Sequence, residues 1–241
     1  MWIVATKDFS VFLSKKNIIY SLVLFPLLAS LGLPVVVNFA EYARHGGIHA
    51  SALPGLLNSF AFFFIVGAVT LPTAIASYSL VGEKVEKSLE PLLATPTSDG
   101  EILLGKSLAA FLPPILAIYA GATIFMILMD EVTRSRLGYL YFPNWIIGTI
   151  MLLVVPLASV LCVESNIIIS SRVNDVRAAQ QLGGLVLIPI ASLYVAAEIN
   201  IVHLDLANLL VISAVLGMLD LILLYFSTHT FRREDILTKW K

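Results

Sequence analysis

Six long apolar runs leave this sequence little freedom in how it can fold. They cover about residues 18–39, 58–81, 107–129, 144–168, 181–199 and 206–227. A helix needs about 20 predominantly apolar residues to cross the hydrocarbon core of a bilayer, which is about 30 Å thick. Within that core the backbone polar groups must be bonded inside the segment, which favours helices. The sequence therefore predicts an all-α membrane protein with six transmembrane helices, in a single domain that covers residues 1–241.

The composition agrees with this prediction. The chain is 59% hydrophobic and only 13% charged, whereas soluble domains are about 45–50% apolar and about 25% charged. The two larger loops expected outside the cell, about 40–57 and 130–143, are too short to form a folded domain. The single cysteine, Cys162, excludes an intrachain disulfide and a zinc cluster built from thiolates.

The fifth run is the weakest candidate span. Gly183-Gly184 and Pro189 interrupt it, and Glu198 closes it. Two alternatives remain for this run, a complete span or a segment that is partly re-entrant. Prolines in the other runs predict kinks, with the freed carbonyls bonded by neighbouring helices: Pro26, Pro72, Pro113, Pro114 and Pro156.

Residues 1–16 precede the first run with an amphipathic pattern. Trp2, Ala5, Phe9, Phe12, Leu13 and Lys16 share one helical face, with other lysines beside it. Trp and Phe opposite Lys are typical of a helix that lies in the plane of the lipid headgroups. We therefore expect an N-terminal interfacial helix.

The distribution of basic residues predicts the orientation. With the N-terminus inside, twelve of the 15 Lys and Arg residues fall in cytoplasmic segments, and only Arg44, Arg134 and Arg136 fall outside. The positive-inside rule then places both termini and residues 82–106 in the cytoplasm. The expected location is the cell (plasma) membrane.

Residues 82–106 form the longest charged interval, between the second and third runs. Val85, Leu89, Leu92 and Leu93 fall at i, i+4, i+7 and i+8, on one face of a short helix. Further on, Ser98 and Glu101 match the S-x-x-E capping box, which predicts a second helix that begins near Asp99. An ordered amphipathic helix outside the bilayer indicates a docking element, and the alternative is a solvated connector between two spans.

This interval resembles the cytoplasmic loop between the second and third spans of ABC transporter permeases of the type-2 exporter family. The family pattern runs loosely E-x-E-x-G-T-L-E-x-L-L-x-T-P, followed by E-I-x-x-G-K. The matching residues here are Glu83, Glu86, Leu89, Glu90, Leu92, Leu93, Thr95, Pro96, Glu101, Ile102, Gly105 and Lys106. Lys87-Ser88 stands where the family has Gly-Thr, which keeps a hydroxyl group but loses the glycine.

The resemblance implies a permease subunit of an ATP-driven exporter. Two permease subunits, identical or related, would line a translocation path, and ABC ATPase subunits would dock on the coupling helix of each. ATP and Mg would bind to the ATPase, so we expect no cofactor in this chain. The expected contacts are the ATPase, a second permease and the bilayer, with no nucleic acid. The implied docking residues are Glu83, Val85, Glu86, Leu89, Glu90, Leu92 and Leu93.

A formal Walker A match, G-x-x-x-x-G-K-S over residues 100–107, does not predict a nucleotide site. A P-loop follows a strand and opens a helix in a βαβ unit, whereas this match runs into a membrane span. The Walker-B-like acids Asp130-Glu131 would lie across the bilayer from Lys106. We therefore expect no ATPase activity from the chain itself, and the energy source must be a separate subunit.

Asp220 is the most unusual charge in the spans. It lies about fourteen residues after Leu206, or about 21 Å along a helix at 1.5 Å per residue. Acidic residues at such depth usually face a bundle interior or a water-filled path. Two alternatives remain: contact with a substrate or proton, or a hydrogen bond to a neighbouring helix. Glu164 is expected near the inner interface, where it meets water or Arg172, and both acids are candidates for the translocation path.

Other function classes have less support. An ion-gradient-driven secondary transporter or channel would use Asp220 as its coupling group. An intramembrane hydrolase is the weakest alternative, because the sequence offers no Ser, His and Asp set at one membrane depth. His45 and His49 have metal-ligand spacing, but Gly46-Gly47 between them disfavours a helix, and no carboxylates complete a shell. No metal site is therefore expected.

Overall fold

The computed structural model describes residues 2–43, 52–85, 98–198 and 205–230. These residues are almost entirely helical, and no strand occurs among them. Six helical segments are long and apolar enough to cross a membrane: Ile18–Phe39, Leu53–Glu83, Asp99–Leu137, Trp145–Arg172, Val176–Ala196 and Leu206–Ser227. Each overlaps one of the six predicted runs, so the predicted all-α membrane fold is confirmed.

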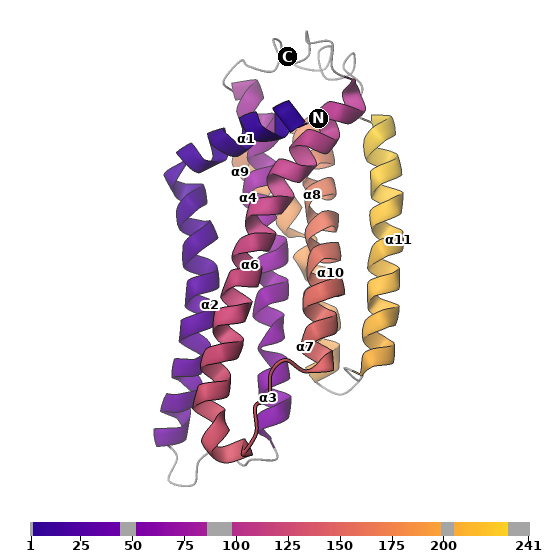
Figure 1. Ribbon diagram of the computed structural model, residues 1–241. Helices are drawn as coiled ribbons and strands as arrows, with labels where there is room; N and C mark the ends of the chain where they lie inside the picture. The colour runs from indigo at the N-terminus through magenta and orange to yellow at the C-terminus, as the bar shows by residue number, and fades with distance from the viewer. Residues whose placement is uncertain (1, 44–51, 86–97, 199–204, 231–241) are drawn as a thin grey trace.

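The long helices run side by side as one bundle (Figure 1). Its main members are α2 (Lys16–Ala43), α4 (Ala61–Val85), α6 (Asp99–Leu137), α8 (Val155–Arg172) and α11 (Leu206–Thr230). The short helix α1 (Trp2–Ser14) lies across one end of the bundle, which we call the α1 end. Shorter helices complete the chain: α3 (Leu53–Ser59), α7 (Trp145–Thr149), α9 (Val176–Gly184) and α10 (Leu187–Glu198).

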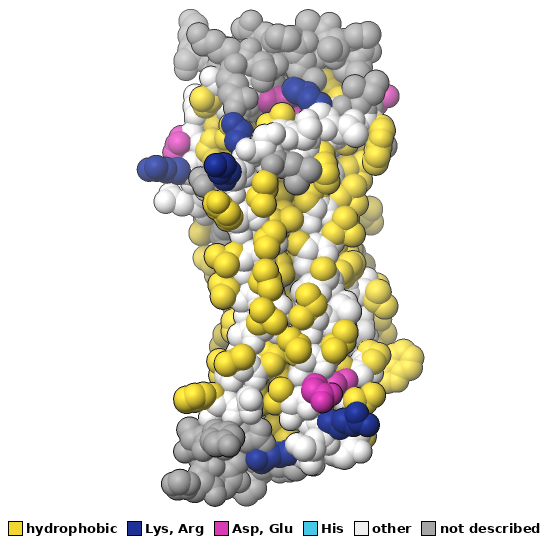
Figure 2. All heavy atoms as spheres, turned by 60° about the vertical axis from the view of Figure 1, so that its left-hand side comes forward, with side chains coloured by type: hydrophobic (Ala, Val, Ile, Leu, Met, Phe, Trp, Pro, Cys, Tyr) yellow, Lys and Arg dark blue, Asp and Glu magenta, His cyan; other side chains and the backbone are white. Residues whose placement is uncertain are grey.

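Helix α4 forms the centre of the bundle. It packs most extensively on α8 and also contacts α2, α6 and α9. Phe64, Phe125 and Phe142 meet in the core that these helices enclose. Outside, large apolar side chains cover α2 and α11, and Figure 2 shows an apolar band between two ends that carry the charged groups. This is the surface that a hydrocarbon environment requires.

Helix α1 confirms the helix predicted over residues 1–16, and its two sides differ in exposure. Trp2 is 64% exposed and Phe9 is also exposed, as expected of residues that face lipid headgroups. Ala5 and Phe12, which were predicted to share the membrane face, are buried and pack with Ile75 of α4 and Ile102 of α6 in a second apolar core. Ala5 and Phe12 of the predicted membrane face therefore attach α1 to the bundle.

The fourth and fifth spans are interrupted helices. In the fourth span a π-helical turn, η1 (Ile150–Val154), precedes Pro156, where the sequence predicts a kink. A π-helical turn of this kind is a recognised cause of helix distortion. In the fifth span α9 ends at Gly184 and α10 begins at Leu187. The predicted interruption at the Gly-Gly pair is confirmed, and helix continues on both sides of it.

The start of α6 forms as its local sequence predicts. Ser98 is the N-cap and its hydroxyl accepts a hydrogen bond from the Glu101 backbone N–H at 3.3 Å. The Glu101 carboxylate accepts in return from the Ser98 backbone N–H at 3.1 Å. Each bond satisfies a donor that the helix terminus leaves open, so the capping box is confirmed and α6 begins at Asp99.

Candidate functional site

The predicted docking element is described only at its two ends. Helix α4 reaches Val85, whose side chain is 67% exposed, and the chain is described again from Ser98. Five of the predicted docking residues lie outside the described residues: Glu86, Leu89, Glu90, Leu92 and Leu93. What the structure does provide is the attachment of this element to the bundle.

A cluster of four charged side chains joins both ends of the element to α1. We call Lys7, Asp8, Glu83 and Lys106 the charge cluster. The Lys106 ammonium lies 2.9 Å from Glu83 Oε2 and 3.1 Å from Asp8 Oδ2. Lys7 donates to Glu83 Oε1 at 2.8 Å. Helices α1, α4 and α6 therefore meet through one set of ion pairs.

Three of the four members of the charge cluster are buried, and Lys7 is half-exposed. Lys106 is completely buried, and Glu83 and Asp8 are 8% and 5% exposed. Lys106 also donates to the Ser79 carbonyl oxygen at 3.1 Å. Burial raises the pKa of the Asp8 carboxyl, and the neighbouring Lys106 opposes that rise. Two cations balance two anions, so the loss of a single buried member would leave an unpaired charge inside the protein.

The charge cluster gives Glu83 a different setting from the predicted rim of a docking surface. Its carboxylate lies between Lys7 and Lys106 at the α1 end of the bundle. Sequence reasoning did not find Asp8 or Lys106 as partners, because 98 residues separate them. The available signals were a lysine two turns after the predicted helix start at Asp99 and an aspartate on the apolar side of the N-terminal helix.

The Walker A match lies within α6. Residues 100–107 follow the helix start at Asp99 without a break, so this segment is a helix rather than a phosphate-binding loop. Its lysine, Lys106, is held by two carboxylates. The Walker-B-like Asp130 accepts the backbone N–H groups of Tyr141 and Phe142 at 2.9 Å and 3.0 Å. Both matches therefore have structural roles.

Two further carboxylates lie inside the bundle, on α8 and α11. Glu164 is 5% exposed and Asp220 is 7% exposed, and the helices that carry them pack against each other. Both oxygens of Asp220 and one of Glu164 have no hydrogen-bond partner among the described residues. Glu164 was expected to meet water or Arg172. The structure instead buries it inside the bundle.

A row of polar side chains, Thr73 and Ser77 of α4 with Cys162 and Asn166 of α8, forms hydrogen bonds between these helices, and we call it the polar seam. Ser77 donates to Asn166 Oδ1 at 2.8 Å, and Asn166 donates to the Cys162 carbonyl oxygen at 2.9 Å. Thr73 lies 2.9 Å from the Cys162 sulfur. Gly183 of α9 passes so close that an added Cβ would lie 1.9 Å from Asn166 Oδ1. Such bonds hold neighbouring helices together in a membrane, so this seam serves packing.

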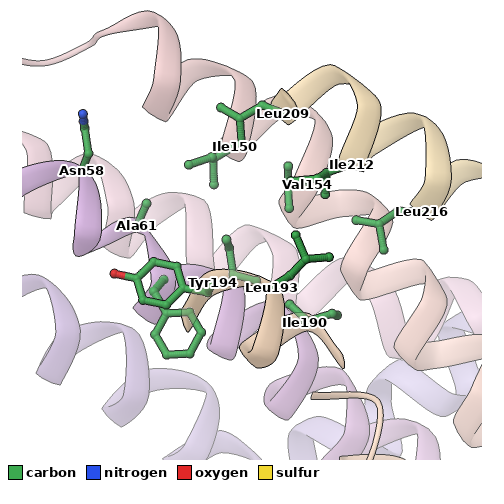
Figure 3. Close-up of a pocket in the computed structure, with 12 residues that line it drawn as sticks. Asn58, Ala61, Ile150, Val154, Ile190, Leu193, Tyr194, Leu209, Ile212 and Leu216 are labelled. Atoms are coloured by element: carbon green, nitrogen blue, oxygen red, sulfur yellow. The ribbon is translucent and has the colours of Figure 1, made fainter. Parts of the chain in front are cut away.

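An apolar pocket opens in the half of the bundle away from α1 (Figure 3). It has a volume of about 60 Å³ and lies between α4, η1, α10 and α11. Its lining residues include Ile65, Val154, Ile190, Ile212 and Leu216. Tyr194 stacks on Phe62 at one side, with ring centroids 4.1 Å apart. The pocket suits an apolar group.

No family model matches this sequence, and no curated protein matches it. The resemblance to type-2 exporter permeases therefore depends on the residues between Glu83 and Lys106.

Proposed function

We propose that this chain is the membrane-spanning permease subunit of an ATP-driven ABC exporter of the type-2 class. It would lie in the cell (plasma) membrane, with the α1 end and both termini in the cytoplasm. Three features support the proposal together: six helices of spanning length, an N-terminal helix that lies across one end of the bundle, and the family motif between α4 and α6.

The observation that carries the proposal is the attachment of the docking element. Glu83 precedes the undescribed residues 86–97 and Lys106 follows them, and both side chains meet α1 in the charge cluster. A force applied to residues 86–97 would therefore act on α1, α4 and α6 at once. A connector without a mechanical role has no need for a completely buried lysine at its base, since burying ion pairs gains little stability.

The docking surface itself follows from residue spacing. Leu89, Leu92 and Leu93 share a predicted helical face with Val85, which is exposed in the structure. An apolar face outside the bilayer needs a partner surface, and a few central apolar contacts dominate the affinity of small interfaces. Glu86 and Glu90 beside this face favour a basic cleft on the partner, which would fix the register of docking.

The partner would be an ABC ATPase that binds ATP and Mg. Two permease subunits, identical or related, would form the translocation path, and closure of the ATPase pair would drive it. The path residues proposed from the sequence are Asp220 and Glu164. In this arrangement the chain itself is no enzyme, and the assembled complex is the translocase.

Charge substitutions in the docking face test this proposal. Leu89→Asp and Leu92→Asp place a charge in an interface that excludes water. Each should insert in the membrane normally, lose at least tenfold in affinity for the ATPase in a pull-down, and fail in transport. Lys84→Ala is the matched control and should bind normally. If both aspartate variants bind the ATPase and transport like the wild type, the element is only a connector.

One observation favours a second function. Asp220 is buried without a bonding partner among the described residues, which is a common feature of coupling groups in secondary transporters. Reconstitution of the purified chain in proteoliposomes separates the two functions. Transport driven by an ion gradient without any ATPase, and lost in Asp220→Leu, would support the secondary transporter. Transport only after addition of the ATPase and ATP would support the exporter.

A further inference from the structure

The carboxylate pair on α8 and α11 lacks the positive charge that its burial requires. Glu164 and Asp220 are each more than nine-tenths buried, and three of their four oxygens have no partner among the described residues. No lysine or arginine in that part of the chain forms an ion pair with either one. An ionised carboxylate in apolar surroundings is costly, and a second one nearby adds repulsion. Two buried carboxylates that stay ionised would therefore need a cation beside them.

The surroundings of the pair restrict which cation fits. Ca²⁺ takes about 6–8 oxygen ligands, and Mg²⁺ keeps an octahedral shell. Two carboxylates supply too few ligands, and no group of three or more His, Cys, Asp or Glu residues occurs in the described ranges. Leu157 of α8 lies near Gly217, three residues before Asp220, where an added Cβ would be 4.0 Å from the leucine side chain. An organic cation, whose charge needs no shell of ligands, suits this setting.

The apolar pocket lies on the same face of α11 as the carboxylate pair. Leu209, Ile212 and Leu216 line the pocket, and Asp220 follows Leu216 at i+4, which places both on one side of the helix. Leu209 and Asp220 are separated by about 16 Å at 1.5 Å per residue. Figure 3 shows the three apolar side chains directed into the pocket. Along this face of α11, the apolar residues that line the pocket are thus followed by the carboxyl group of Asp220.

We propose that Glu164 and Asp220 bind the charged group of an organic monocation, whose apolar body occupies the pocket between α4, η1, α10 and α11. The part of the proposal that concerns transport rests on the proposed exporter function and names a lipophilic cation as the substrate class. The binding site itself requires only this chain. Apolar pockets with a few well-placed polar groups are the usual form of small-molecule sites.

Binding of decyltrimethylammonium to the purified chain tests the proposal. It combines an apolar chain with a single fixed charge, and uncharged decanol is the matched ligand control. Equilibrium dialysis of radiolabelled ligand against the chain in nanodiscs of zwitterionic lipid, with empty nanodiscs subtracted, gives the affinity. Asp220→Asn and Glu164→Gln should each weaken decyltrimethylammonium at least tenfold, which corresponds to about 1.4 kcal/mol. Decanol should bind these variants like the wild type.

A second pair of variants tests the pocket. Ile212→Trp fills the pocket and should weaken both ligands. Ile222→Trp, on the lipid-facing side of the same helix where Ile222 is 50% exposed, should bind both normally. These variants, like the two amides, can be checked for insertion and monodispersity before dialysis.

The proposal is overturned if the wild-type chain takes up no more decyltrimethylammonium than empty nanodiscs. It is equally overturned if the two amide variants bind this cation like the wild type, since the carboxylates would then serve packing or hold only protons. The ATPase takes no part in this assay, so failure of the docking experiment would leave these results unaffected.

Discussion

Removal of the Lys106 ammonium should destabilise the bundle strongly. Lys106 is completely buried and lies 2.9 Å and 3.1 Å from two carboxylates. Lys106→Met keeps most of the side-chain volume but leaves Asp8 unpaired and Glu83 with only the half-exposed Lys7. Loss of one partner from a buried ion pair costs about 3–5 kcal/mol. With a shift of about 2–4 °C per kcal/mol for a chain of this size, the melting temperature should fall by about 6–20 °C.

The single cysteine provides the assay. Cys162 is completely buried, so a dye that becomes fluorescent on reaction with a thiol reports unfolding of the bundle. Lys16→Met, at an exposed lysine, is the control and should melt with the wild type. Unchanged melting of Lys106→Met would refute the assignment of the charge cluster as a structural junction.

A triple variant that removes the three buried charges together distinguishes unpaired charge from lost packing as the cause of the destabilisation. Lys106→Met combined with Asp8→Asn and Glu83→Gln leaves no buried charge without a partner. Because replacement of a complete buried set by neutral groups is often close to neutral in stability, the triple variant should melt well above Lys106→Met alone. If it melts at or below the single variant, lost packing rather than unpaired charge explains the effect.

Two further predictions concern topology and packing. On a cysteine-free background, Ser135→Cys should react with an impermeant thiol reagent in intact cells and Ser14→Cys should not; the reverse pattern would invert the proposed orientation. Gly183→Ala should lower the melting temperature, because the added Cβ would lie 1.9 Å from Asn166 Oδ1 and must displace it from its bonded seam. Gly184→Ala, which meets no atom within 4 Å, is the control, and equal melting of the two variants would show that the close approach of Gly183 to Asn166 adds nothing to stability.

The spans and helix ends could be predicted because their signals are local. Hydropathy over about 20 residues defines a span, and the bond between Ser98 and Glu101 involves residues three positions apart. Likewise the Gly-Gly pair at Gly183 marks the interruption of the fifth span by its own backbone properties. These features depend on the order of residues along one helix and on nothing that packs against it.

The two charged sites could be predicted only in part. Asp220 stands out in the sequence as a charge in an apolar run, but its burial between packed helices depends on which helices are neighbours and how each is rotated. The pairing of Asp8 with Lys106 joins residues 98 positions apart, and no periodicity connects them. Single unusual residues were thus visible in the sequence, whereas their partners required the packed bundle.

Photo-crosslinking from position 92 tests the exporter assignment most directly. A photoreactive benzoylphenylalanine would replace Leu92 in the docking element, with Trp145, 84% exposed near the opposite end of the bundle, as the matched control position. Irradiation of membranes that contain the chain and its native partners should give a covalent adduct from position 92 whose peptides identify an ABC ATPase, and none from position 145. No ATPase adduct from position 92, or an equal yield from both positions, would contradict the assignment.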